Sequence, residues 1–137
     1  MPKHLTEAQV EQFRRDGFIF PMTAISADEA AECRACLEDY ERRTGQGVQE
    51  SLTLKSHMPF GLFSRLIRNE RVLDAVEDLI GPNILCWGSS FFLKEPHSES
   101  YVSWHADTYY YGIKPQETVT AWIAFTRADQ VSGCMRF

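Results

Sequence analysis

The sequence predicts an α+β fold, in which helices pack on a β-sheet core. Two observations indicate this class. Residues 1–82 are mainly helical by their capping signals and apolar spacing, whereas residues 83–137 are rich in the β-branched and aromatic residues that favour strands. The chain has 137 residues, 44% of them hydrophobic, and no linker, repeat or low-complexity segment divides it. We therefore expect a single domain that spans residues 1–137.

The first helix is marked at both ends. Thr6 and Gln9 have the spacing of a capping box, in which each side chain accepts a hydrogen bond from the backbone N–H of the other residue. Gly17 stands where a glycine commonly ends a helix. A short apolar run at 18–20 follows and is expected to form a strand.

Three further helices are predicted before residue 82. A second capping box at 26–29 begins a helix whose apolar stripe ends in the polar residues 42–45. An irregular stretch follows, and the apolar residues within 60–67 suggest a short helix. Asn69 then begins a last helix, which Gly81 ends ahead of a proline.

The second part of the chain is expected to supply the sheet. Candidate strands run over 84–95, 102–105 and 118–125, and a fourth begins at Cys134. In the strand at 118–125, Thr120 and Trp122 share one face, which is suited to lining a cavity.

Composition excludes several classes of function. The formal net charge of −5 leaves no excess of lysine and arginine to neutralise phosphates, so nucleic acid is not an expected partner. No apolar run reaches the roughly 18 residues of a membrane span, and no signal sequence opens the chain. We expect a soluble, cytoplasmic protein without a membrane partner.

The four cysteines are expected to be reduced. Cys33 and Cys36 form a CxxC pair, and Cys86 and Cys134 stand alone. A thioredoxin-type motif opens a helix after a strand, whereas this pair falls well inside a predicted helix. Buried structural thiols are therefore favoured over redox chemistry.

The segment around His105 and Asp107 carries the clearest chemical signal. In a strand, residues two apart share a face, so the imidazole and the carboxylate can converge on one point. They would supply two of the three protein ligands of a non-haem iron site, in which two histidines and one carboxylate leave positions open for substrate and oxygen. His-x-Asp alone also occurs by chance at surfaces. The neighbouring Trp104 and residues 109–111 could line a pocket or belong to the core.

Several blocks of the sequence together are more specific. They are residues 90–96 (SFFLKEP), 104–107 (WHAD), 119–124 (VTAWIA) and 132–136 (SGCMR). In this order and spacing they resemble the phytanoyl-CoA dioxygenase (PhyH) family of iron(II)- and 2-oxoglutarate-dependent oxygenases. Residues 5–20 and the Gly81 stop also fit, so the resemblance covers most of the chain.

The resemblance implies a fold, a reaction and a pair of metal ligands. The fold would be a double-stranded β-helix, a cupin-like jelly roll wrapped by N-terminal helices. His105 and Asp107 would be catalytic residues that bind iron(II), with 2-oxoglutarate as co-substrate and with dioxygen and a small organic molecule as the other reactants. Halogenating relatives carry a small residue at the position of Asp107, so hydroxylation is the expected outcome.

The resemblance also suggests which residues line the co-substrate pocket. Trp122 falls at a family position beside 2-oxoglutarate, and Lys55 and His57 lie in a stretch that can add polar contacts. A solvated surface lysine is the alternative reading of one further candidate, Lys94. The candidates for the pocket are Ser90, Phe92, Lys94, Thr120 and Trp122.

The family pattern is not matched to its end. Family members continue past the block at 132–136 to a distal histidine ligand and an arginine that binds 2-oxoglutarate, and no histidine follows Asp107 here. His97 is a substitute ligand or a solvated loop histidine. We expect a truncated N-terminal fragment with only the first jelly-roll strands, whose open sheet edges favour self-association. The alternatives are a non-catalytic homologue and a cupin-like binding or association module.

Overall fold

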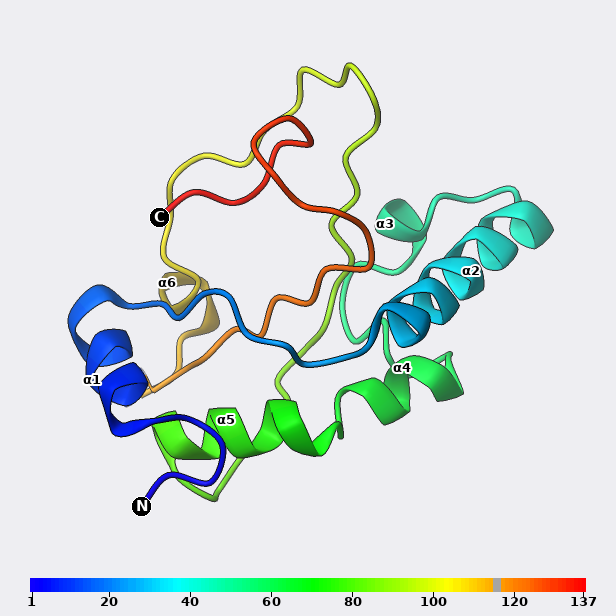
Figure 1. Ribbon diagram of the computed structural model, residues 1–137. Coiled ribbons are helices and arrows are strands. Elements are labelled where there is room, and N and C mark those ends of the chain that lie inside the picture. The colour runs from blue at the N-terminus through cyan, green and yellow to red at the C-terminus, as the bar shows by residue number, and fades with distance from the viewer. Residues whose placement is uncertain (115–116) are drawn as a thin grey trace.

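A computed structural model describes residues 1–114 and 117–137 of the chain. Figure 1 shows helices through the first part of the chain and a long irregular path after α5. The N-terminal segment and α1 lie beside α5, and α2 contacts α3. The helices are α1 (Glu7–Asp16), α2 (Ala27–Thr44), α3 (Val48–Ser51), α4 (Gly61–Leu66), α5 (Glu70–Ile80) and α6 (Thr108–Tyr111).

The prediction of an α+β jelly roll is wrong, because the described residues form helices and no β-strand. Side chains that favour strands do not make a sheet unless neighbouring strands supply the ladder of hydrogen bonds. Residues 84–95, 102–105 and 118–125 form no such ladder. One backbone hydrogen bond links residues 84–95 to the helical part, from Ser56 N to Ser89 O at 3.1 Å. Self-association through open sheet edges therefore has no sheet to act through in the described residues.

The predicted limits of α1 are confirmed. Gln9 N donates to Thr6 Oγ1 at 3.2 Å, and Thr6 N donates to Gln9 Oε1 at 2.8 Å. Gly17 ends the helix with φ of 82°, a left-handed conformation that glycine adopts without a steric penalty. The strand expected at 18–20 is not formed.

The limits of α2 and α5 are confirmed in the same way. Ser26 and Glu29 make the second capping box, and Gly45 ends α2. The Asn69 side chain caps α5, which Gly81 ends. The short helix expected within 60–67 is α4. Two helices of four residues each, α3 and α6, were not predicted.

The main core lies among α2, α3 and α4. Its buried side chains are Cys33, Leu37, Val48 and Phe63. Residues 83–137 reach this core through two aromatic rings. The ring centroid of Phe63 lies 4.9 Å from that of Phe91 and 5.9 Å from that of Phe125.

Residues 83–137 contribute no buried hydrophobic residue, as far as the chain is described. Large apolar side chains in this part stand in solvent, among them Leu85 at 86% exposure and Val131 at 97%. Their removal from water would be favourable by about 25 cal/mol per Å². The second part therefore lies over the helical core without a core of its own.

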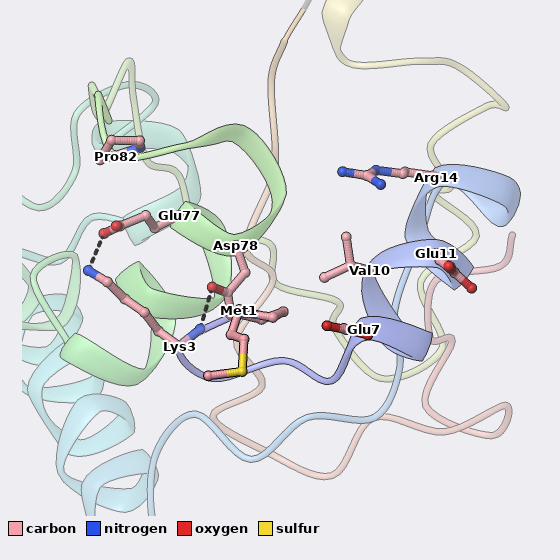
Figure 2. Close-up of a pocket in the computed structure, with 10 residues that line it drawn as sticks. Met1, Lys3, Glu7, Val10, Glu11, Arg14, Glu77, Asp78 and Pro82 are labelled. Atoms are coloured by element: carbon pink, nitrogen blue, oxygen red, sulfur yellow. Dashed lines mark hydrogen bonds and ion pairs between the residues drawn. The ribbon is translucent and has the colours of Figure 1, made fainter.

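A second, smaller cluster joins α1 to α5. Leu5, Val10 and Ala75 are buried together. Beside them the Asp78 carboxylate accepts backbone hydrogen bonds from three consecutive residues, Lys3 at 2.6 Å and His4 and Leu5 at 2.8 Å each. Figure 2 shows Asp78 and Glu77 directed at Lys3. Asp78 thus holds the N-terminal segment against α5.

Desolvation alone would raise the pKa of Asp78, but the N–H groups of Leu5, Lys3 and His4 together hold this pKa below its ordinary value of 3.8. A lowered pKa means that the contribution to stability is present above the ordinary value and is lost as the pH falls through the pKa of the folded state. We expect Asp78→Ala to lower the free energy of unfolding by about 1 kcal/mol at neutral pH, as for a lost helix cap that is partly exposed. Urea unfolding at pH 7 measures this change.

Below about pH 3.8 the difference between Asp78→Ala and the wild type is expected to shrink. Asp74→Ala is the matched control on the same helix, since Asp74 makes only a 4.0 Å ion pair with Lys3. A loss of stability that is equal at pH 7 and at low pH would contradict this role of Asp78.

Candidate functional site

His105 and Asp107 lie in contact, although the strand expected there is absent. The Nε2 atom of His105 is 3.1 Å from Oδ1 of Asp107. Asp107 has helical backbone angles (φ −53°, ψ −41°) and precedes α6, so the chain bends between the two residues instead of alternating as a strand. The side chains are about one third exposed, at 35% and 40%. An imidazole nitrogen and a carboxylate oxygen therefore face each other at an accessible position.

The ring of His105 is held in one orientation by its other nitrogen. Nδ1 lies 2.7 Å from the carbonyl oxygen of Ser103. A carbonyl oxygen only accepts, so Nδ1 carries the proton and donates it. This directs Nε2 at Asp107. Histidines that bind metals commonly donate their second ring N–H to a backbone carbonyl in this manner.

The second oxygen of Asp107 has a partner from another segment. Thr120 Oγ1 donates to Asp107 Oδ2 at 2.7 Å, across 13 positions of the sequence. The Asp107 side chain does not cap α6, which it precedes. Its two oxygens therefore face His105 and Thr120 instead of the helix N–H groups.

The aromatic residues around this pair do not enclose it. Trp104, Tyr109 and Tyr110 are exposed at 78%, 87% and 74%. The edge of the Tyr110 ring approaches the ring of His105, with centroids 5.9 Å apart, and Tyr111 packs on Trp87 at 4.3 Å. In the described residues, the pair stands at an open surface beside aromatic side chains.

The other predicted site residues have surroundings of their own. Ser90 and Phe92 are exposed, and Trp122 is exposed at 45%. The side chain of Lys94 lies over Gly133, where an added Cβ would come within 2.7 Å of Nζ. Within residues 1–114 and 117–137, no hydrogen bond or ion pair joins these four candidates to His105, Asp107 or Thr120.

The described residues place no third metal ligand beside the pair. Among the described residues, no group of three or more His, Cys, Asp and Glu side chains could hold a metal ion. His97 is exposed in a loop with φ of 63°. The donor set thus fits an iron(II) site in kind, with one imidazole and one carboxylate, and is one protein ligand short of three.

A polar cluster of Ser56, His57 and Ser89 was not predicted as a unit. Ser56 is 1% exposed, and its hydroxyl donates to the Ser89 carbonyl oxygen at 2.8 Å. The backbone N–H of His57 donates to Ser89 Oγ at 3.1 Å, and its Nδ1 lies 2.7 Å from the same oxygen. Ser56 and His57 lie 33 and 32 positions before Ser89, so no local pattern could reveal the contact. The cluster fixes residues 84–95 to the loop before α4.

The hollow drawn in Figure 2 lies away from the predicted iron ligands His105 and Asp107, neither of which lines it. It is lined by the N-terminal segment, α1 and α5, including Met1, Arg14 and Pro82. None of the predicted site residues lines it. It is therefore not the expected iron site.

Comparison with known proteins places the chain in a family. The family model described as phytanoyl-CoA dioxygenase (PhyH) matches residues 13–137. The chain belongs to this family, whose class is that of dioxygenases among the oxidoreductases. One relative is the ectoine dioxygenase of Streptomyces avermitilis, 25% identical over 147 aligned positions. The alignment covers 96% of this chain and 50% of that relative, so the chain spans about half the relative's length. No solved structure matches significantly.

None of the helices in the described residues has the length and apolar character needed to cross a bilayer.

The cysteines are all unpaired with one another, as expected for reduced thiols. Cys33 is 2% exposed, and burial, together with the nearby Glu32 carboxylate, raises its pKa to about 11. Burial also raises the pKa of Cys36. A reactive redox cysteine has a lowered pKa, so the environment of the CxxC pair opposes thioredoxin-type chemistry.

We expect Cys33 to react with a thiol reagent such as DTNB at least about 100-fold more slowly than a thiol with the ordinary pKa of 9.0. The reason is that a pKa two units higher lowers the fraction of reactive thiolate about 100-fold. The exposed Cys86 should supply the fast phase. Time courses of labelling at pH 8 measure this. Cys86→Ser should remove the fast phase and Cys33→Ser should leave it, whereas fast labelling of Cys33 in the folded chain would refute the assignment.

Proposed function

We propose that this chain supplies the His-x-Asp part of the iron site in a 2-oxoglutarate-dependent dioxygenase that hydroxylates a small organic substrate. One observation carries the proposal. In a chain of the dioxygenase family, His105 Nε2 and Asp107 Oδ1 lie 3.1 Å apart, with the ring already oriented by the Ser103 carbonyl. Two donors so close together can bind the same metal ion without a large rearrangement of the backbone.

The kind of donors supports iron(II) as the metal. Imidazole and carboxylate together suit a non-haem iron(II) site with open positions. When bound there, iron(II) and 2-oxoglutarate would supply the oxidative chemistry that activates dioxygen for insertion into a C–H bond. The protein's own residues orient the donors. His105 presents Nε2 because Nδ1 is held, and Asp107 supplies the negative charge.

Four residues are proposed as contacts of the co-substrate: Ser90, Phe92, Lys94 and Trp122. Lys94 is the cation among them, and an ammonium group can pair with a 2-oxoglutarate carboxylate. In the present arrangement its stem rests on Gly133, so such a contact requires the side chain to swing away. Trp122 and Phe92 would add apolar surface to the pocket.

The whole enzyme activity is proposed for a protein that contains these 137 residues. The proposed chemistry requires a third protein ligand and a cation for 2-oxoglutarate, and the described residues hold no group of three His, Cys, Asp or Glu side chains that could bind the metal. The chain aligns with half of the ectoine dioxygenase. This coverage supports the proposal that further segments complete the site. Ectoine, which that relative's name identifies as its substrate, is the first candidate to test.

Anaerobic titration of the 137-residue chain with iron(II) in the presence of 2-oxoglutarate tests the proposed ligands. We expect binding, seen as a weak visible charge-transfer band, that His105→Ala and Asp107→Ala each weaken by at least about 10-fold, because each removes one donor. His4→Ala is the matched control, since only the backbone of His4 makes a hydrogen bond, to α5.

A folded wild-type chain that binds no iron(II) would refute the proposed site in this chain. Equal binding by the wild type and by both alanine variants would assign the metal to other residues. Loss of binding in His97→Ala would identify His97 as the third ligand.

A second candidate function, association with another copy of the chain, is favoured by the apolar side chains in residues 83–137 that stand in solvent. They include Leu85, Trp104, Val131 and Phe137, the last at 69% exposure. Exposed apolar side chains mark interfaces where they form a contiguous patch, and a second copy of the chain would remove them from water. Sedimentation over a range of concentrations should then show a discrete dimer that Val131→Asp weakens, whereas Met58→Asp, at an exposed apolar residue in the first part of the chain, leaves it intact. A monomer at all concentrations would exclude this function.

A further inference from the structure

We propose that Thr120 is a positioning residue for the metal-binding carboxylate of Asp107. This inference rests on the proposed function, because it assigns a role in the same site. It gives Thr120 a role that acts through Asp107 and not on 2-oxoglutarate.

The hydroxyl group of Thr120 has a single proton to donate. Thr120 Oγ1 donates that proton to Asp107 Oδ2 at 2.7 Å. With this proton engaged, Oγ1 can still accept hydrogen bonds but cannot donate another. A carboxylate such as that of 2-oxoglutarate also only accepts, so Thr120 cannot bind it while the bond to Asp107 is made. The observed bond therefore excludes a hydrogen bond from Thr120 to a co-substrate carboxylate.

The two oxygens of Asp107 are divided between two partners. Oδ2 is taken by Thr120, and Oδ1 is the atom that faces His105 Nε2 at 3.1 Å. The hydrogen bond to Thr120 therefore leaves free the oxygen that lies beside the histidine nitrogen. It also fixes the rotation of the carboxylate about its own bond, since the two oxygens cannot exchange while Oδ2 is held.

Asp107 has few other restraints. It precedes a helix of only four residues, and its side chain makes no hydrogen bond to that helix. If a metal ion takes both Oδ1 and Nε2, the direct contact with His105 ends. Of the observed hydrogen bonds, the one from Thr120 would then be left to hold the carboxylate.

Thr120 also connects Asp107 to the helical core. It belongs to residues 118–125, which end in Phe125, and the Phe125 ring packs on Phe63 of the core at 5.9 Å. The hydroxyl at 120 thus ties the segment before α6 to a segment that the core itself holds.

The test measures metal affinity and the free carboxylate separately. Mn(II), whose electron paramagnetic resonance signal is lost on binding, serves as the probe for affinity in the full chain. Loss of a residue that holds a ligand commonly weakens metal affinity 10- to 100-fold. We expect Thr120→Val, which removes the hydroxyl and keeps the shape, to weaken Mn(II) binding about 10-fold. Thr120→Ser keeps the hydroxyl and should restore the affinity.

The carboxylate is followed in the metal-free chain through the Asp107 ¹³Cγ resonance. Thr120→Val should shift this resonance and Thr120→Ser should not. Thr126→Val is the matched control, an exposed threonine in the same part of the chain, and should change neither readout. Thr120 is itself exposed, so the valine variant is expected to fold.

The outcomes separate this inference from the proposed function. If the wild type binds Mn(II) and Thr120→Val does so equally well with an unmoved Asp107 resonance, the positioning role is overturned and the iron site stands. If the wild type binds no Mn(II), the proposed function fails, and the role of Thr120 in metal binding fails with it, even where the resonance shifts. Weaker binding in both Thr120→Ser and Thr126→Val would overturn the assignment to the hydroxyl.

Discussion

The attachment of residues 83–137 to the helical core is the constraint on which the rest of the structure depends. Two rings, Phe91 and Phe125, reach the core, and the cluster of Ser56, His57 and Ser89 adds hydrogen bonds. Each hydrogen bond contributes about 1 kcal/mol and each aromatic pair about 1 kcal/mol beyond its burial. Every fully buried hydrophobic side chain lies at or before Ala75 in the described part of the chain. The candidate site of His105, Asp107 and Thr120 therefore lies in the less strongly held part of the molecule, where local opening costs less free energy.

The helices could be predicted because the signals that limit them are local. A capping box acts over four residues, and a glycine that ends a helix acts at one position, so Thr6, Gly17 and Asn69 were sufficient to place helix ends. The prediction of a sheet was wrong because strand formation depends on partners that are distant in the sequence. Residues 84–95 have the composition of a strand, but a ladder needs partners that composition cannot specify. Helix α3 was not predicted for a related reason. Its four residues are too few for a helical repeat, and Val48 is buried against the core.

The candidate site also combines one local contact, which could be predicted, with contacts between distant segments, which could not. His105 and Asp107 are two residues apart, and their contact survives the replacement of the expected strand by a bend, because short spacing keeps the two side chains within reach in either conformation. Contacts that join distant segments could not be predicted. Two examples are the hydrogen bond from Thr120 to Asp107 and the contact of the Lys94 side chain with Gly133. Both depend on how distant segments are placed in space. The contact within the pair could therefore be predicted from the sequence, whereas the arrangement around the pair could not.

The shortness of α6 has a consequence for how a ligand would be captured. A helix of four residues is below the length at which a helix sustains itself in water, because forming the first turn is unfavourable. Its order must come from its ends, and Asp107 stands at one of them. Ordering of this turn and occupation of the site are then thermodynamically linked, and the apparent affinity equals the intrinsic affinity multiplied by the fraction of molecules in which the turn is formed. The exposed rings of Tyr109 and Tyr110 belong to the same turn, so the aromatic surface beside the pair depends on the ordering of that turn.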